Sequence, residues 1–244
     1  MSLELAAPTS SSGKRAFVHQ LFTRIAPRYD TFNRLASFGL DQRWRDQAVE
    51  ASGVRPGMVV LDVCSGTGDL ALLCAAKVGA NGLVIGVDFN EQMLRGAAAK
   101  RPTQSQRASV QWLRGDALCL PFASGTFDRL FIGFSTRNLS DLKQGITEMT
   151  RVLKPNGQLV ILETGRPSSS LVRFGYWCFL HTVVRGIGWV LTGAVWPFTY
   201  LARSVKAFVT PTQFVELLQS CGTRARYIPL SSGLASLYLA MKSA

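Results

Sequence analysis

Histidine is nearly absent from this 244-residue chain, which holds only His19 and His181. Five cysteines are scattered along it, and no two of them form a C-x-x-C pair. Structural zinc sites are built from clusters of cysteine and histidine, so the sequence predicts no metal centre. Dispersed cysteines without a pairing pattern are typical of reduced thiols. They predict a cytoplasmic protein, or one on the equivalent matrix or stroma side of an organelle.

Acidic residues are also scarce, because 15 Asp and Glu stand against 27 Lys and Arg, a formal net charge of +12. From Thr164 onward the chain has 8 basic residues and a single acidic one, Glu216. The same third contains Trp177, Trp189 and Trp196 among apolar runs. Basic residues mixed with tryptophan favour an anionic lipid surface, so we predict peripheral membrane contact. No Lys- and Arg-rich cluster or stacking motif is present, and nucleic acid is not expected as a partner.

An apolar stretch is missing from the N-terminus, where residues 1–13 are polar. We therefore see no secretory signal and expect this segment to be disordered. With 47% hydrophobic residues, the chain can bury a full core, and residues 14–244 are predicted to form a single domain. The sequence leaves open whether the chain forms a homo-oligomer.

What the chain does have is a regular alternation of short apolar runs and helical patterns. Strands are expected at 58–63, 82–88, 109–116, 127–134, 157–164, 224–230 and 235–241. Helices between and after them are expected at 69–78, 91–100, 139–153 and 210–222. This order is typical of βαβ units and predicts an α/β fold with a doubly wound, mostly parallel seven-stranded sheet. Ligands of such sheets bind outside the carboxyl ends of the strands.

Two segments fall outside this alternation. Residues 14–52 have helical patterns and precede the first strand, which predicts an N-terminal helical cap. Residues 165–208 interrupt the path to the last helix and are too long for a simple connection. Within this segment residues 171–185 are apolar except for Arg173, His181 and Arg185, which would share one side of a single helix. We interpret 165–208 as a hydrophobic, basic lid.

The stretch LDVCSGTGDLA reads as a glycine-rich turn that leaves a strand and enters a helix. Its glycines, Gly66 and Gly68, fit a nucleotide-binding pattern that also suits a nicotinamide enzyme. Asp62 and Asp69 beside the loop would, however, repel a pyrophosphate. S-adenosylmethionine has no phosphate but carries an ammonium and a sulfonium, which carboxylates attract. We therefore predict S-adenosylmethionine as the cofactor, with Asp62, Gly66 and Gly68 beside its methionyl part.

Acids also stand at the ends of the next two expected strands. Asp88 ends the second strand and is expected to accept hydrogen bonds from the two ribose hydroxyls. Asp116 follows the third and could accept from the adenine amine, while Ala117 offers its backbone N–H. One such acid alone is commonly a turn or helix cap. Three acids at successive strand ends favour a nucleoside site.

Several motifs resemble those of one known family. They are APRYD, LDVCSGTGD, VIGVDFNEQML, GDALCLPF, FDRLFIGFSTRNLSD and MTRVLKPNGQLVILE. Together they resemble the UbiE/MenG-type C-methyltransferases of ubiquinone, menaquinone and phylloquinone biosynthesis, from about residue 22 to the C-terminus. The glycine loop is general to class I methyltransferases, whereas APRYD and the RN after the fourth strand are more particular to this family.

The resemblance implies a class I S-adenosylmethionine-dependent methyltransferase fold whose seventh strand is antiparallel. It implies that Thr67 contacts the cofactor together with Asp88, Asp116 and Ala117, and that Gly133 stands at a cofactor contact. The implied substrate is a prenylated benzoquinol or naphthoquinol.

The chain also departs from the family's pattern on the expected substrate side. Many members carry Ser where Gly133 stands and His where Asp41 stands. These departures leave the cofactor assignment in place and leave the acceptor ring open.

Three residues are candidates for catalysis. A ring carbon becomes a good nucleophile only when a neighbouring hydroxyl loses its proton, so a base is needed, directly or through water. Arg137 and Asn138 follow the fourth expected strand, where the substrate would lie, and Arg137 could stabilise the phenolate and orient a water molecule. Tyr29, in the N-terminal cap, is a candidate for closing the site.

Two other functions remain open at this level. One is methylation of another lipophilic ring, of the tocopherol or sterol type. The other is an RNA- or protein-binding module that keeps the cofactor fold without its chemistry.

Overall fold

The computed structural model describes residues 11–100 and 110–243 of the chain. The disorder expected for residues 1–10 lies outside this part. Helix α1 starts at Ser11, so the N-terminal cap begins three residues earlier than the predicted boundary at residue 14.

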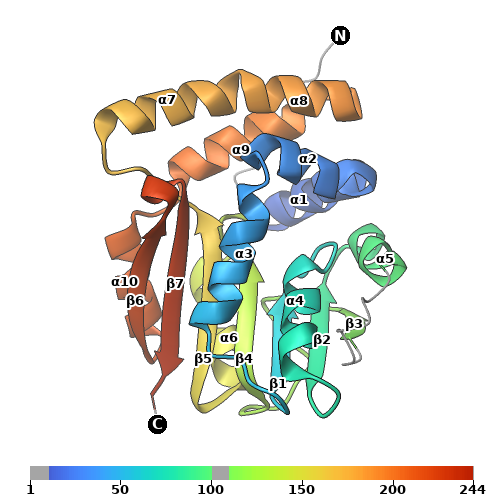
Figure 1. Ribbon diagram of the computed structural model, residues 1–244, viewed down its shortest axis with the longest axis vertical. Coiled ribbons are helices and arrows are strands. Elements are labelled where there is room, and N and C mark those ends of the chain that lie inside the picture. Colours follow the sequence, from blue (N-terminus) through green and yellow to red (C-terminus); the bar gives the residue numbers. More distant parts are fainter. Residues whose placement is uncertain (1–10, 101–109, 244) are drawn as a thin grey trace.

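Seven strands form one sheet in the order β3-β2-β1-β4-β5-β7-β6 (Figure 1). The strands are β1 Val59–Val63, β2 Leu83–Asp88, β3 Val110–Arg114, β4 Phe127–Gly133, β5 Leu153–Thr164, β6 Thr223–Leu230 and β7 Ala235–Lys242. The pairs among β1 to β5 are parallel, whereas β7 is antiparallel to both β5 and β6. The central strands read as continuous apolar runs because both of their faces are covered. The predicted fold class is confirmed, including the antiparallel last strand.

Ten α-helices and three short 3₁₀ turns are present among the described residues. The helices are α1 Ser11–Ile25, α2 Tyr29–Ser37, α3 Leu40–Ala51, α4 Asp69–Val78, α5 Glu91–Ala99, α6 Leu142–Val152, α7 Ser170–His181, α8 Val183–Thr192, α9 Trp196–Ala207 and α10 Pro211–Ser220. The 3₁₀ turns are η1 Ala26–Arg28, η2 Thr136–Asn138 and η3 Ser231–Gly233.

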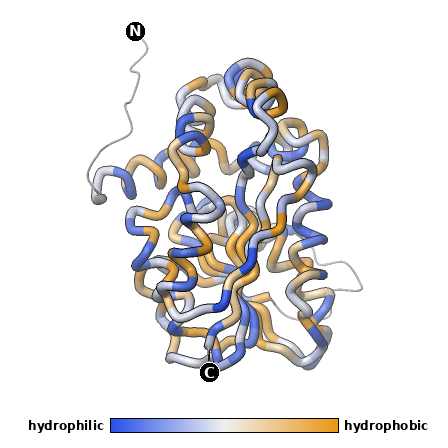
Figure 2. The backbone as a smooth tube through the Cα atoms, turned by 90° about the vertical axis from the view of Figure 1, so that its left-hand side faces the viewer, coloured by the Kyte–Doolittle hydropathy of each residue, from blue (hydrophilic) through white to orange (hydrophobic). Residues whose placement is uncertain are grey.

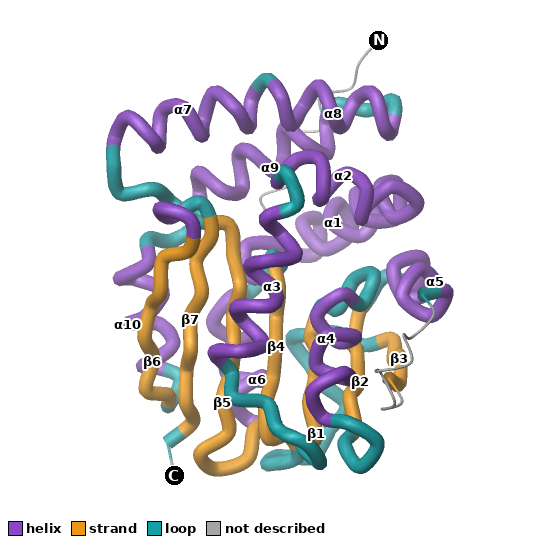
Figure 3. Tube along the Cα trace, viewed as in Figure 1, coloured by secondary structure: helices purple, strands orange, loops and turns teal. Residues whose placement is uncertain are grey.

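Hydrophobic clusters lie on both faces of the sheet. On one face α3 and α4 pack through side chains such as Trp44 and Leu70, and Figure 3 shows these two helices in front of the strands. On the other face α6 and α10 pack through Ile146, Met149 and Phe214. The helices thus bury the sheet between two layers and leave its carboxyl edge to the remaining helices.

The N-terminal cap and the segment 165–208 share a third hydrophobic cluster. Phe17 and Leu21 of α1 and Phe32 of α2 pack with Leu180 of α7 and Phe198 of α9. In Figure 1 these helices lie together above the strands, with α7 and α8 outermost. Two segments that are about 150 residues apart in the sequence therefore form one structural layer beyond the carboxyl ends of the strands.

Two expected helices have different limits in the structure. The helix expected at 139–153 is shorter, because η2 occupies Thr136–Asn138 and the side chain of Asp141 caps α6 by accepting from the backbone N–H of Gln144 at 2.9 Å. The single helix expected from 171 to 185 is instead interrupted at Thr182, between α7 and α8. Arg173 and Arg185 consequently lie on different helices. Figure 2 shows hydrophobic residues along the strands and again on these outer helices.

Candidate active site

The glycine-rich loop between β1 and α4 has a backbone that only certain residues adopt. Gly66 and Gly68 have φ values of +56° and +83°, and Cys64 also has a positive φ. A Cβ added at Gly68 would come within 2.3 Å of Cη2 of Trp112. Gly68 is therefore required by the turn and by the close approach of β3, as expected for a left-handed position.

Asp88 holds this loop from the end of β2. Its Oδ2 accepts a hydrogen bond from the backbone N–H of Gly66 at 2.9 Å, and its Oδ1 accepts from that of Asn90 at 2.8 Å. Burial raises the pKa of Asp88, and the backbone N–H groups oppose that rise. The carboxylate is thus a fixed acceptor at the edge of the sheet.

A pocket, here called the strand-end pocket, lies over the ends of β1, β2 and β3. Four of the residues predicted to bind the cofactor line it: Gly66, Asp88, Asp116 and Ala117. Helix α1 closes the pocket from above, and its Arg15 forms an ion pair with Oδ2 of Asp116 at 2.8 Å. The structure therefore brings together the residues assigned to the ribose and to the adenine.

Four other residues predicted to bind the cofactor are not on the described wall of this pocket. Asp62 lies beneath the glycine loop, where its Oδ2 accepts from the backbone N–H of Ala71 at 3.1 Å. Thr67 donates instead to Oδ1 of Asp30 at 2.6 Å. Gly68 contacts Trp112, and a Cβ at Gly133 would come within 2.7 Å of Cδ1 of Leu70. For these two glycines, packing explains the absence of a side chain.

Polar atoms under the loop fit a polar ligand. Oδ1 of Asp62 and the hydroxyl of Ser65 are buried and have no hydrogen-bond partner among the described residues. Burial raises the pKa of Asp62 to about 8. Buried polar atoms without partners are rare in folded proteins, and they commonly mark a place where a ligand or water supplies the missing bond. The residues present thus suit a polar cofactor that supplies the missing hydrogen bonds at this loop.

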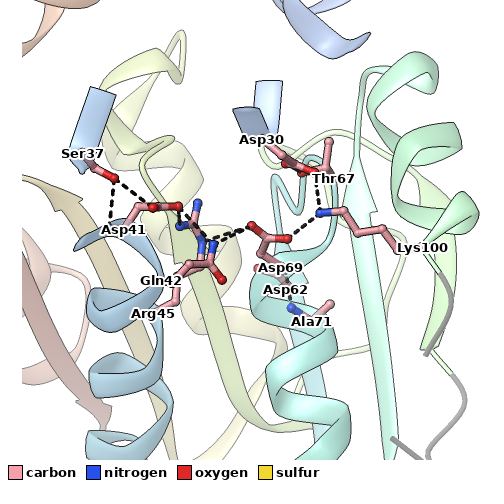
Figure 4. Close-up of polar contacts among 10 residues, drawn as sticks. All are labelled: Asp30, Ser37, Asp41, Gln42, Arg45, Asp62, Thr67, Asp69, Ala71 and Lys100. Carbon is pink, nitrogen blue, oxygen red and sulfur yellow. Dashed lines mark hydrogen bonds and ion pairs between the residues drawn. The ribbon is translucent and has the colours of Figure 1, made fainter. Parts of the chain in front are cut away.

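From the sequence, the Asp69 carboxylate was expected to attract the cationic groups of the cofactor, but in the structure it is paired within the protein. Figure 4 shows its carboxylate between Lys100 and Gln42, with which it forms an ion pair and a hydrogen bond of 3.3 Å. Burial raises the pKa of Asp69, but Lys100, Arg45 and Gln42 outweigh that effect and the pKa lies below its ordinary value. Its charge is therefore compensated within the protein. Lys100 also pairs with Asp30 at 2.8 Å, which fastens α2 to the glycine loop.

A second space, here called the lid cavity, has a volume of about 430 Å³ and lies between the N-terminal cap and α7 to α9. Most of its wall is apolar, with side chains such as Phe32, Phe179 and Leu201. Phe22, Tyr29 and Asn138 line both the lid cavity and the strand-end pocket.

Arg137 lines the lid cavity and is held by Glu163, the second-last residue of β5. Nη1 of Arg137 donates to Glu163 and to the carbonyl oxygen of Phe134, and the hydroxyl of Thr136 donates to Glu163 at 2.6 Å. Glu163 is only 1% exposed. Nε of Arg137 is buried and has no partner among the described residues. The side chain is therefore fixed through Nη1, and the N–H of Nε has no protein partner among the described residues.

Asn138 and Tyr29 stand at the junction of the two spaces. Oδ1 of Asn138 accepts a hydrogen bond from the hydroxyl of Tyr200 at 3.2 Å. Tyr29 lies against the glycine loop, since a Cβ at Gly66 would be 4.0 Å from Cε1 of its ring. Burial raises the pKa of Tyr29, so its phenol stays protonated. The three predicted catalytic residues thus all line the lid cavity, and Tyr29 and Asn138 also line the strand-end pocket.

Glu163, Arg15 and Lys100 are not among the site residues predicted from the sequence. Glu163 could have been predicted, because it is an acid near the end of a buried strand, and the same position made Asp88 a candidate. Arg15 and Lys100 could not, because each is one of many basic residues on helical segments.

The comparisons with known proteins agree with this geometry. The sequence pattern of the ubiE/COQ5 methyltransferase family matches residues 9–242. A demethylmenaquinone methyltransferase of Desulfitobacterium hafniense is 37% identical over 237 residues, 97% of this chain and 94% of that protein. A 2-phytyl-1,4-naphtoquinone methyltransferase of Synechocystis sp. is 39% identical over 241 residues, 98% of either chain.

Solved structures share the fold at lower identity. A SAM-dependent methyltransferase from Aquifex aeolicus superposes with a TM-score of 0.60 at 21% identity, covering 81% of this chain and 88% of that one. The family match spans nearly the whole chain, and both relatives exceed one third identity over more than nine tenths of their lengths. The chain therefore belongs to the ubiE/COQ5 methyltransferase family, and it is a methyltransferase whose methyl donor is S-adenosylmethionine.

Proposed function

We propose that this methyltransferase methylates a ring carbon of a prenylated quinol in membrane quinone biosynthesis. One observation carries the proposal: a polar pocket at the strand ends meets a larger, mostly apolar cavity at Phe22, Tyr29 and Asn138. A methyl donor in the first and a lipophilic ring in the second would meet at that junction. The relatives named above act on demethylmenaquinone and on a phytyl-naphthoquinone.

The strand-end pocket is the proposed cofactor site. Asp88 would accept from the ribose hydroxyls, Asp116 from the adenine amine, and Ala117 would donate its backbone N–H. Gly66 lets the backbone approach the methionyl part, and beneath the loop Asp62 has an oxygen that no described residue hydrogen-bonds. When bound, S-adenosylmethionine supplies an electrophilic methyl group on a sulfonium.

The lid cavity is the proposed acceptor site. Its size of about 430 Å³ falls within the range typical of small-molecule pockets, roughly 300–1,000 Å³. Its apolar wall suits an isoprenoid tail, and Arg137 and Asn138 are among its polar groups. The relatives' substrates favour a naphthoquinol ring over a benzoquinol.

The chain's own residues then have distinct tasks. Arg137 donates to the ring oxygen beside the reacting carbon and stabilises its negative charge, while Glu163 keeps the guanidinium in place. Arginine stays charged and cannot take the proton, so a water molecule beside Arg137 and Asn138 accepts it. With the cofactor bound, the ring carbon would take the methyl group. The proton that this carbon then loses would return to the ring oxygen and restore the quinol, so that the proton first accepted by water is the one released to solvent. Tyr29 covers the junction and excludes bulk water.

Methyl transfer to a defined ring tests this function. We expect the protein to convert a 2-prenyl-1,4-naphthoquinol, kept reduced by dithionite, to its 3-methyl product in the presence of S-adenosylmethionine. Mass spectrometry detects one methyl group in place of one hydrogen, and a methyl-deuterated donor establishes its source. A 3-methylated naphthoquinol is the control acceptor, because its ring carbon is already occupied. Absence of product from naphthoquinol and benzoquinol acceptors alike would refute the proposed function.

The lid is also proposed to lie against a membrane. Leu171 and Phe174 on α7 and Val190 on α8 are exposed, although they are large and apolar. Phe38 and Val172 are exposed and also line the lid cavity, so the cavity reaches the surface within this apolar region. No helix among the described residues is long and apolar enough to cross a bilayer.

Basic groups accompany the exposed apolar side chains. Nζ of Lys206 lies 5.8 Å from the ring centre of Trp177, whose side chain is partly exposed. Burial lowers the pKa of His181, and the nearby charges of Arg185, Lys206 and Arg203 lower it further. Several cations are thus gathered around α7 and α8, which is the combination that binds anionic interfaces. Trp189 is exposed on this side, whereas Trp196 packs against Phe17.

Charge reversal on the lid should weaken membrane binding. Arg173→Glu combined with Arg185→Glu is expected to lower partitioning onto phosphatidylserine vesicles about tenfold or more, because each basic group near such a surface contributes about 1 kcal/mol. Co-sedimentation measures the partitioning. The control is Arg224→Glu with Arg226→Glu, the same change in charge on exposed positions of β6, near the opposite end of the sheet. Equal losses in both variants would mean that net charge, and not the lid, governs binding.

A further inference from the structure

Asp41 is the only carboxylate along the lid cavity among the residues that the structure describes. It stands in the first turn of α3 and is 4% exposed, so its small accessible surface faces the cavity. The proposed mechanism assigns it no role. A buried charge is costly unless it is paired, and a charge placed beside an apolar acceptor site calls for an explanation.

Three neighbouring side chains hold the Asp41 carboxylate (Figure 4). The hydroxyl of Ser37 donates to Oδ1 at 2.8 Å, while Nη1 of Arg45 and Nε2 of Gln42 donate to Oδ2 at 2.6 and 3.1 Å. Arg45 is itself buried beside Asp41, and the two side chains form an ion pair. A carboxylate can accept about four hydrogen bonds, so one position, on Oδ1, is left. Asp41 is therefore a rigid acceptor that cannot donate.

Arg137 presents the opposite chemistry to the same cavity, because a guanidinium can only donate. Tyr29, Arg45 and Arg137 line the lid cavity together with Asp41. The carboxylate of Asp41 and the guanidinium of Arg137 thus both border the space where the ring is proposed to lie.

The ring has two oxygens in para positions, and its oxidation state changes what they can do. In the quinol each oxygen can donate and accept, whereas in the quinone each can only accept. Arg137 can donate to an oxygen in either state and cannot distinguish them. Asp41 can bind a hydroxyl but would face a quinone carbonyl with two acceptors opposed and no hydrogen between them. A site built to bond a hydroxyl strongly rejects an analogue that lacks it.

We infer that Asp41 is a specificity-determining residue that selects the reduced ring by accepting a hydrogen bond from its second hydroxyl. The inference rests on the proposed function, because it places the quinol ring in the lid cavity. Only the reduced ring carries the nucleophilic carbon. Rejection of the quinone thus keeps the site free of a non-reacting competitor from the same membrane pool.

Binding of a matched redox pair tests the inference without turnover. The probes are 2,3-dimethyl-1,4-naphthoquinone and its quinol, which have no free ring carbon to be methylated or to react with cysteine. Calorimetry is done anaerobically on the full chain with S-adenosylhomocysteine bound, and with reductant present for the quinol. We expect the wild-type protein to bind the quinol at least about tenfold more tightly than the quinone. Asp41→Asn should bring the ratio of the two Kd values close to one, because an amide can donate to the quinone carbonyl.

The control variant is Asp46→Asn, the same chemical change on an exposed position of the same helix. It should keep the wild-type ratio. Affinity for S-adenosylhomocysteine serves as the folding check for Asp41→Asn, and the wild-type ratio tests the inference even if that variant fails to fold. Equal binding of quinol and quinone by the wild type, or an unchanged ratio in a folded Asp41→Asn, overturns the inference and leaves the proposed function standing. Binding of neither form by the wild type overturns both.

Discussion

Arg137→Ala is expected to lower kcat by about 10²- to 10³-fold while the Kd for S-adenosylmethionine changes little. This is the usual effect of removing one donor that stabilises charge in a transition state. The structure gives the reason: Nε of Arg137 has no protein partner among the described residues, and the side chain lines the lid cavity and not the strand-end pocket. Steady-state kinetics with a soluble naphthoquinol, and calorimetry with the cofactor, measure the two quantities.

The same substitution has a second, structural effect that must be separated from the catalytic one. Without Arg137, Glu163 becomes a buried carboxylate that has lost its ionic partner, and the loss of one member of such a pair costs about 3–5 kcal/mol of folding free energy. The double variant Arg137→Ala with Glu163→Gln removes that charge. It should recover much of the stability, measured by urea unfolding, without recovering kcat. If activity returns together with stability, Arg137 supports the fold and does not act on the ring.

Asp88→Ala is expected to weaken binding of S-adenosylmethionine by about 100-fold or more. The change removes the acceptor proposed for both ribose hydroxyls, and a hydrogen bond to a charged group contributes about 1.5–3 kcal/mol. Calorimetry measures the affinity. Some loss of stability is also expected, because the backbone N–H groups of Gly66 and Asn90 lose their partner.

Asp128→Ala is the matched control for that loss of stability. Asp128 likewise accepts from a backbone N–H, that of Val59 at 2.9 Å, and it pairs with Lys154 at 2.8 Å, but it does not line the strand-end pocket. The control should lose stability and retain cofactor affinity. A comparable loss of affinity in both variants would show that Asp88 acts only through the stability of the sheet.

Much of the architecture followed from local patterns. Apolar runs and helical periodicity placed all seven strands, and the rule that ligands bind at the carboxyl ends of parallel strands placed Gly66, Asp88, Asp116 and Ala117 around one pocket. The strands could be used in this way because the carboxyl ends of parallel strands lie at one edge of the sheet, independently of how the helices pack. The helix boundaries at Leu142 and Thr182 were missed, since each depends on a cap or a break of one or two residues.

The local sequence around Asp69 does not reveal how its charge is compensated. The sequence shows a carboxylate beside a nucleotide loop, and it does not show that Lys100, 31 positions away, neutralises it. Asp62, next to the same loop, remained without such a cation and kept an unpartnered oxygen among the described residues. Asp62 and Asp69 flank the same loop but differ in their partners, because Lys100 at the end of α5 pairs with Asp69 and not with Asp62.

By itself, then, the sequence determined the sheet, the glycine turn and the positions at the strand ends, because periodicity and turn chemistry act between residues close in the chain. The tertiary structure alone decided that Glu163 holds Arg137, that α1 closes the strand-end pocket through Arg15, and that Asp41 faces the lid cavity. These relations join segments up to about 150 residues apart. Such segments meet only after the cap and the lid have packed into one apolar cluster, and the energy of an ion pair or hydrogen bond depends on distance in space and on exclusion of water, neither of which a linear pattern records.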